Sequence, residues 1–203
     1  APNGGSISTS SKRCGAQRAI QASASACSTC SVVAFSRCWL LRQALDANGK
    51  ALASVGDIDV ADSDFIGIHI EHWLWLMRVR LLTRMGRTQE IADAAAHVTR
   101  IEQSSADPII LLIHHQSRVE LACVSGDLSA ARHYAAAALR LADKHPSPYF
   151  LAFAMSTSAA GKMAEGDFAG AVRDNVEALA VVRRSNVALE YESEILANLA
   201  DAH

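Results

Sequence analysis

The chain has 203 residues, half of them apolar and only 5% aromatic, with a formal net charge of −2. This length suits one sizeable domain or one array of several repeats. The charge is uneven, because residues 1–45 hold five basic side chains and no acidic one; subtracting these five from the 19 basic residues leaves 14 against 21 acidic ones, a net charge near −7. An acidic segment such as residues 46–203 is poorly suited to non-specific nucleic-acid binding, which depends on neutralising phosphates. No apolar run approaches the roughly 18 residues of a membrane-spanning helix, so we expect neither direct nucleic-acid binding nor membrane insertion.

The first 37 residues differ in composition from the rest and are rich in Ser, Ala, Gly and Thr. Three interpretations stay open. The segment is a disordered or loosely ordered lead-in, it has the acid-poor composition of an organelle transit peptide, or its reading frame is shifted. Within it, Cys27 and Cys30 have the spacing of a metal or redox pair, and Cys14 and Cys38 lie at irregular distances from them. A structural zinc site needs four ligands with defined pair spacing, so we interpret these cysteines as incidental. We expect a reducing, cytoplasmic setting without metal or cofactor.

Residues 38–65 read as a leading helix followed by an acidic loop. Trp39, Leu40, Leu41, Ala44 and Leu45 give a helical apolar stripe. Asn48-Gly49 is a plausible helix stop. In the loop, Asp64 is placed to cap the helix that comes next.

Glycine then recurs at a fixed interval of 40 residues, at Gly86, Gly126 and Gly166. Asp107-Pro108 and Ser147-Pro148 are also 40 apart, and each pair suits an N-cap acceptor followed by proline at the first helical position. Gly tolerates the left-handed conformation that ends a helix. Asp127 and Asp167 can cap the next helix at once. The pattern predicts antiparallel helix pairs over residues 66–105, 106–145 and 146–185, with a partial unit at 186–203.

The apolar positions of the second helices recur at the same interval. They are Leu128, Ala131, Ala135, Ala138 and Leu139 in one unit and Phe168, Ala171, Ala178 and Leu179 in the next; the earlier unit has Ile91, Ala95, Val98 and Ile101. The predicted fold is therefore all-α, and strand signals are thin.

At these residues the chain resembles the tetratricopeptide repeat (TPR). With the shared glycine as the turn glycine, Trp75 falls on the large aromatic of the first helix, and Ala131, Ala171, Ala138 and Ala178 fall on the two small packing residues. The period of 40 in place of 34, and His115 and Met155 in place of the aromatic, depart from the family. Longer, Ala-rich repeats of this kind are similar to the C-terminal repeats of large ATP-dependent LuxR-type transcription regulators and of ATPase-linked bacterial adenylate cyclases. The resemblance implies a superhelix of helix hairpins over residues 68–203.

We therefore expect a non-catalytic module that binds a protein, a peptide or a small effector, from a larger bacterial signalling or transcription-regulatory protein. One alternative is a helical regulatory region acting in cis on a nucleotide cyclase or ATPase. A second is a self-association scaffold that dimerises through its C-terminal helix. The sequence lacks a phosphate loop, a GxSxG and an HExxH, so nothing in it argues for catalysis.

The resemblance also implies a concave groove lined by the first helix of each unit. Its positions in this sequence are Trp73, Leu76, Arg80 and Thr83, then Ile113, Gln116, Glu120 and Cys123, and finally Phe153, Ser156, Ala160 and Met163. Among them Arg80, Gln116 and Glu120 form a polar trio. We expect Arg80→Glu and Glu120→Lys to weaken partner binding without loss of helicity.

The other titratable side chains are interpreted as structural. His114 and His115 are adjacent on a helix and point about 100° apart, so one packs and the other is exposed. His69 and His72 lack a third metal ligand, and Glu190, Glu192 and Glu194 are read as a solvated acidic face. Residues 188–203 read as a first helix without its partner, from which we expect this chain to be a fragment of a longer protein.

Overall fold

The computed structural model describes residues 40–57, 69–104 and 106–202. Its described residues form helices and no strand, which confirms the all-α prediction at that level. The chain divides into two compact units, Ala1–Leu74 and Trp75–His203. Several predictions concern residues outside the described ranges: the character of residues 1–37, the roles of Cys14, Cys27, Cys30, Cys38 and Trp39, and the Asp64 cap.

In the first unit, helix α2 (Leu41–Ser54) leads into a short 3₁₀ segment, η1 (Val55–Asp57). Ala44, Leu45 and Ala51 on one face of α2 are buried. The predicted helix stop at Asn48-Gly49 is wrong, because α2 continues for five residues beyond Gly49. Asn48 is fully buried and its Nδ2 donates a hydrogen bond of 2.8 Å to the carbonyl oxygen of Leu74. A residue that favours a helix end is thus held inside the helix by a tertiary contact.

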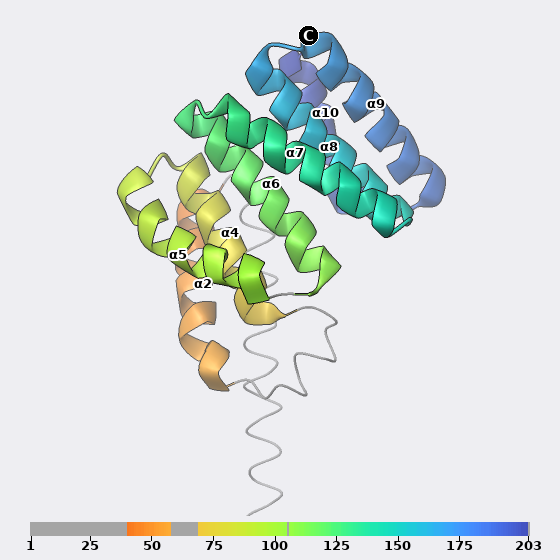
Figure 1. Ribbon diagram of the computed structural model, residues 1–203. Helices are drawn as coiled ribbons and strands as arrows, with labels where there is room; N and C mark the ends of the chain where they lie inside the picture. Colours follow the sequence, from red (N-terminus) through yellow and green to blue (C-terminus); the bar gives the residue numbers. More distant parts are fainter. Residues whose placement is uncertain (1–39, 58–68, 105, 203) are drawn as a thin grey trace, which may run out of the picture. The chain divides into compact units, whose positions relative to one another are not determined.

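Seven further α-helices follow in the described part of the chain (Figure 1). The first of them, α4, spans the boundary between the two units. The bounds of these helices are α4 Ile70–Arg84, α5 Thr88–Ser104, α6 Pro108–Ser125, α7 Leu128–Lys144, α8 Pro148–Glu165, α9 Phe168–Ser185 and α10 Glu192–Ala202. Helices α6, α7, α8 and α9 pack against one another in this order, and α8 also contacts α6. Trp75 on α4 stacks on His97 of α5, with ring centroids 3.7 Å apart.

The three glycines end helices as predicted. Gly86, Gly126 and Gly166 have φ angles of 67°, 74° and 80°. Only glycine adopts this left-handed region without a steric cost from Cβ. At Gly126 the turn is closed by the amide of Asp127, which donates to the carbonyl of Ala122 at 2.9 Å. Two residues thus suffice to reverse the chain between α6 and α7.

The predicted caps also form. The Asp107 side chain accepts hydrogen bonds from the amides of Ile109 and Ile110, and Ser147 accepts one from Phe150; a proline stands directly after each cap. Asp127 and Asp167 accept from the amides of Ala130 and Gly170, each at 2.9 Å. These contacts satisfy N–H groups that the first helical turn leaves without partners.

Small side chains form the contact surfaces of the second helices. Ala131, Ala138, Ala171 and Ala178 are completely buried. Helices α7 and α8 approach each other closely at Gly161, because a Cβ atom placed on this glycine would lie 3.2 Å from the Cβ atom of Ala135. The predicted stripes were wrong at their first positions: Leu128 and Phe168 are exposed. Each stands directly after the capping aspartate, at the start of its helix.

The C-terminal segment differs from the expected single helix. Ala188 has a φ of 55°, and a 3₁₀ segment, η2 (Leu189–Tyr191), precedes α10. Asn186 at the end of α9 also has a positive φ, of 52°. Helix α10 packs against α9 and α8, and Figure 1 shows it behind α8. Its residue Ile195 is buried, whereas Leu196 is exposed.

Candidate functional site

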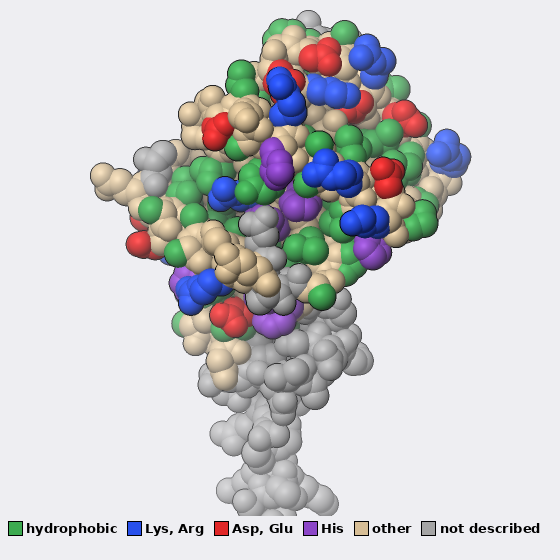
Figure 2. Space-filling model, in the orientation of Figure 1, with side chains coloured by type: hydrophobic (Ala, Val, Ile, Leu, Met, Phe, Trp, Pro, Cys, Tyr) green, Lys and Arg blue, Asp and Glu red, His purple; other side chains and the backbone are tan. Residues whose placement is uncertain are grey.

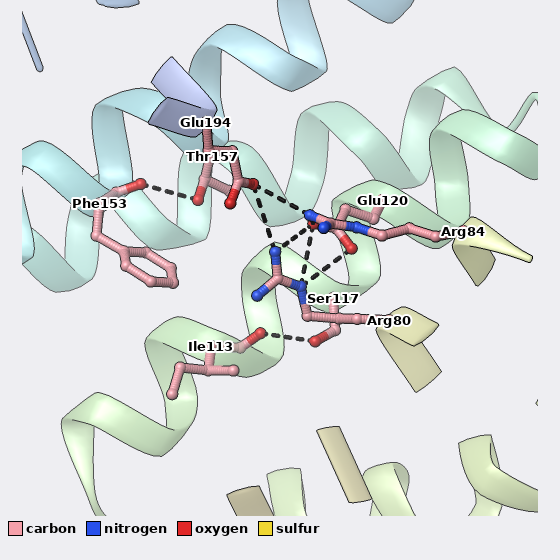
Figure 3. A network of polar contacts seen from close by, with 8 residues as sticks. All are labelled: Arg80, Arg84, Ile113, Ser117, Glu120, Phe153, Thr157 and Glu194. Atoms are coloured by element: carbon pink, nitrogen blue, oxygen red, sulfur yellow. Dashed lines mark hydrogen bonds and ion pairs between the residues drawn. The ribbon is translucent and has the colours of Figure 1, made fainter. Parts of the chain in front are cut away.

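Four charged side chains from three helices meet in the second unit (Figure 3). Arg80 and Arg84 lie one turn apart on α4, so both point to the same side of that helix. Glu120 comes from α6 and Glu194 from α10. We call these four residues the arginine–glutamate network.

The pair of Arg80 and Glu120 is the tightest part of the network. Arg80 Nη2 lies 2.6 Å from Glu120 Oε1, and Nε lies 3.0 Å from both carboxylate oxygens. This is the two-point geometry that a planar guanidinium makes with a carboxylate. Arg84 Nη2 also donates to Glu120 Oε1, at 3.1 Å. One carboxylate therefore accepts from two guanidinium groups.

Glu194 completes the network from the C-terminal helix. Its Oε1 lies 3.2 Å from Arg84 Nη2 and 3.5 Å from Arg80 Nη2. Two carboxylates thus balance two guanidinium groups. The charge balance matters because two arginines one turn apart repel each other on an isolated helix.

The network is largely removed from water. The side chain of Arg80 is 10% exposed and that of Glu120 is 17% exposed. Burial alone would lower the pKa of Arg80, but the charges of Glu120 and Glu194 raise it above its ordinary value. Burial would likewise raise the pKa of Glu120, and Arg80 and Arg84 instead lower it. Both groups are charged, and each stabilises the charged form of the other at low solvent exposure.

Two buried hydroxyl groups lie beside the network on α6 and α8 (Figure 3). Ser117 Oγ donates to the carbonyl of Ile113, and Thr157 Oγ1 donates to the carbonyl of Phe153, each at 2.9 Å. The two bonds are 40 residues apart and have the same geometry. Each hydroxyl proton is thus used within its own helix.

Most of the predicted groove residues are buried. Eight of the twelve positions are at most 8% exposed: Trp73, Leu76, Arg80, Thr83, Ile113, Gln116, Phe153 and Ser156. Trp73 belongs to the first unit and the other seven to the second. Glu120 and Met163 are half-buried, as are Cys123 and Ala160. The C-terminal segment covers two of the positions, because Glu194 contacts Arg80 and the Tyr191 ring lies 5.0 Å from that of Phe153.

The predicted polar trio is realised in part. Arg80 and Glu120 do meet, but the side-chain oxygen of Gln116 is buried without a hydrogen-bond partner in the described part of the chain. Sequence reasoning missed Arg84, although its position four residues after Arg80 places both on one helix face. It also missed Glu194, and the interpretation of that residue as part of a solvated face is wrong. No local signal links residue 194 to a helix more than 100 residues earlier.

Histidine and tyrosine rings form a second cluster on α6 and α7. The His114 ring meets that of Tyr134 edge-on at 5.8 Å, and the guanidinium of Arg118 lies 5.0 Å from the same tyrosine ring. His114 is buried as predicted for one of the two, but His115 is half-buried and not exposed. Burial, with the charges of His115 and Arg118, lowers the pKa of His114 to about 3. Histidine side chains are among those visible at the surface in Figure 2, where they are coloured purple.

Over the described ranges, no group of three or more His, Cys, Asp or Glu side chains is placed to hold a metal ion. His69 and His72 stack on each other, with ring centroids 3.7 Å apart. None of the helices in those ranges combines the length and apolarity needed to cross a membrane. No protein-family model matches the sequence, and no match was found among curated proteins or solved structures.

Proposed function

We propose that the chain is a non-catalytic, TPR-like repeat module that binds a protein, a peptide or a small effector along its first helices, as part of a larger bacterial signalling or transcription-regulatory protein. The ion pair of Arg80 and Glu120 is the observation that carries this proposal. These residues are 40 apart, and in a stack of similar hairpins equivalent positions on neighbouring first helices face each other. The matching hydroxyl bonds of Ser117 and Thr157, also 40 apart, support the same arrangement.

A face built in this way suits recognition because each hairpin adds one helix to it. First helices placed side by side offer an extended surface, to which a helical or extended segment can bind across several units. Residues such as Phe153 supply apolar contact at this face, and Arg80 and Arg84 supply carboxylate binding; in this structure those groups are occupied by the chain's own Tyr191, Glu120 and Glu194.

Charge reversal at Arg80 or Glu120 is no longer a clean test of binding. The two side chains are each other's main partners, so either substitution places like charges together in a poorly hydrated site. A loss of binding would then be confounded with a loss of stability. The test should use positions with some exposure.

Photo-cross-linking of peptides selected on the chain tests the proposal. Peptides from a random display library, each about 20 residues long so that a helical one spans several first helices, would be selected on the full chain carrying p-benzoylphenylalanine at position 163 or 176. Met163 is half-buried at a predicted groove position, and Val176 is exposed on α9. We expect selected peptides to cross-link from position 163 and not from position 176. Failure to select any peptide, or equal cross-linking from both positions, would contradict the proposal.

Self-association through the C-terminal segment is a second candidate function. Leu189 and Leu196 are exposed there, 48% and 44%. Leu189 belongs to η2 and Leu196 to α10, and a second copy of the chain can cover both side chains. Light scattering of the full chain tests this: a dimer that Leu196→Lys dissociates would support it, and a monomer at high concentration would exclude it.

A further inference from the structure

The connection from α9 to α10 is conformationally unusual. Within the described ranges, Asn186 and Ala188 are the two non-glycine residues with positive φ. The left-handed region is costly for alanine, whose Cβ approaches its own backbone there. The helix starts at Pro108 and Pro148 instead come after extended capping residues. The backbone at Ala188 is therefore held in place by the tertiary contacts of the residues after it.

Residues 191–195 present three kinds of side chain to the first helices and to α9. The ring of Tyr191 meets that of Phe153 nearly at right angles. Glu194 binds Arg80 and Arg84. Ile195 is buried in a cluster with Ala178, Val181 and Val182 of α9. An aromatic ring, a carboxylate and an aliphatic side chain thus lie within five residues.

These contacts hold α10 in place. The helix has 11 residues, and an isolated helix of that length is marginal in water. Ile195 is its buried residue, while Leu196 faces solvent. A short terminal segment with one fully buried side chain, after a connection with positive φ at Ala188, is expected to open more readily than the helices between α6 and α9.

We propose that residues 189–202 are a built-in ligand of this module, and that the site they fill receives a helical segment of a partner protein with the same chemistry: an aromatic residue, a glutamate or aspartate three positions later, and an aliphatic residue next to it. This inference rests on the function proposed above and adds the class of partner. Arg80 and Arg84 supply two guanidinium groups for the incoming carboxylate, in place of Glu194. Phe153 supplies the ring that Tyr191 now contacts.

Competition between the two segments regulates the site. Because α10 already makes the same contacts, a partner can bind only those molecules in which α10 is displaced. Its apparent affinity equals its intrinsic affinity multiplied by that small fraction. A change that weakens α10 raises that fraction and therefore raises the affinity for the partner. The device acts as an internal competitor.

A fluorescent peptide with the sequence of residues 188–202 is the probe, titrated by anisotropy into the full chain and two variants. Glu194→Gln removes the charge that Arg80 and Arg84 bind. Glu192→Gln is the matched control, since it removes a more exposed ion pair of the same helix, with Arg183 of α9, and exposed pairs contribute little. We expect Glu194→Gln to bind the peptide at least tenfold more tightly than the wild type, and Glu192→Gln to bind it within about threefold of the wild type. A second peptide, with glutamine at the position of Glu194, should bind the Glu194→Gln chain at least tenfold more weakly than the peptide with the original glutamate does.

Equal affinity of the three chains, or indifference to the peptide carboxylate, would overturn the proposal. So would dimerisation of the Glu194→Gln chain by exchange of α10 between copies, seen by light scattering. Should Glu194→Gln fail to fold, hydrogen exchange of the wild type decides: saturating peptide should speed exchange of α10 amides and leave α8 unchanged, and an unaffected α10 would overturn the idea. The two proposals can fail separately. If selected peptides cross-link at position 163 but Glu194→Gln does not change the affinity for the 188–202 peptide, the proposed function stands and this inference alone is removed.

Discussion

Arg80 and Glu120 lie 40 residues apart and form a two-point ion pair between α4 and α6. A second arginine, Arg84, shares the same carboxylate. Because the pair is mostly buried, loss of one partner should lower the free energy of unfolding more than the loss of an ion pair on the surface does.

Replacement of Glu120 by glutamine should therefore be strongly destabilising. It leaves Arg80 poorly hydrated, with Glu194 as its remaining carboxylate partner. Removing one partner of a buried pair costs about 3 kcal/mol. Urea unfolding followed by circular dichroism measures the change. Glu90→Gln is the control, because the exposed pair of Arg87 and Glu90 is worth about 0.5 kcal/mol. Equal effects of the two substitutions would contradict the importance of burial.

The turn glycines should respond to alanine in the opposite sense to a helical glycine. Gly166→Ala forces a Cβ into a backbone with φ of 80° and should destabilise the chain by about 1 kcal/mol. Gly49 lies inside α2 with open space around its Cα, so Gly49→Ala should stabilise the first unit by about 0.5–1 kcal/mol. Thermal unfolding of both variants checks this. Stability changes of the same sign in the two variants would show that backbone conformation does not control the response to alanine at these positions.

Two buried asparagines should also behave differently. Asn175 on α9 is completely buried, and neither polar atom of its side chain has a hydrogen-bond partner in the described part of the chain. Ala135 occupies the position 40 residues earlier. Asn175→Ala removes polar groups that cost about 1–3 kcal/mol when buried unpaired, so it should raise the free energy of unfolding.

Asn48→Ala is the comparison, since the Asn48 side chain donates to the carbonyl of Leu74. Its loss should lower the free energy of unfolding by about 1–2 kcal/mol. Denaturant titrations of the two variants measure both changes. A loss of stability in Asn175→Ala as large as that in Asn48→Ala would contradict the difference in hydrogen bonding.

Acid should destabilise the chain partly through the histidine cluster. Burial lowers the pKa of His114 to about 3 and that of His115 to about 4, from an ordinary value of 6.5. The charges of Arg118, Arg140 and His133 around them act in the same direction. Between these values the unfolded chain binds more protons than the folded one, so stability is present above pH 6.5 and falls as the pH drops toward 3. For His114 the loss between pH 6.5 and 5 is about 2 kcal/mol.

His114→Phe keeps a ring against Tyr134 but removes the titrating group, so it should flatten the pH dependence of the unfolding free energy between about pH 6.5 and 4. His145→Gln, at an exposed histidine, is the control. Urea titrations at several pH values supply the slopes. An unchanged slope in His114→Phe would show that this histidine contributes little to acid sensitivity.

Local features of this chain could be predicted from local sequence. The turns at Gly126 and Gly166 and the caps at Asp107, Ser147, Asp127 and Asp167 each depend on a few neighbouring residues. Backbone sterics and hydrogen bonds to the nearest amides decide them, and both act within about four residues. The half of the candidate site formed by Arg80 and Glu120 was predictable for a related reason, since their spacing matches the interval between the glycines.

Other features depend on residues far apart in the chain. Asn48 stays inside a helix because the carbonyl of Leu74 accepts its amide proton. Glu194 is partly removed from solvent because the chain turns at Ala188 and α10 brings its carboxylate to Arg80 and Arg84. By itself, then, the sequence determined the turns and caps that bound the helices between Asp107 and Gly166, through short-range sterics and hydrogen bonds to the nearest amides. Tertiary structure alone decided that α2 continues past Gly49, that Glu194 joins Arg80 and Arg84, and which segment covers the first helices, because those contacts join groups that no local pattern connects.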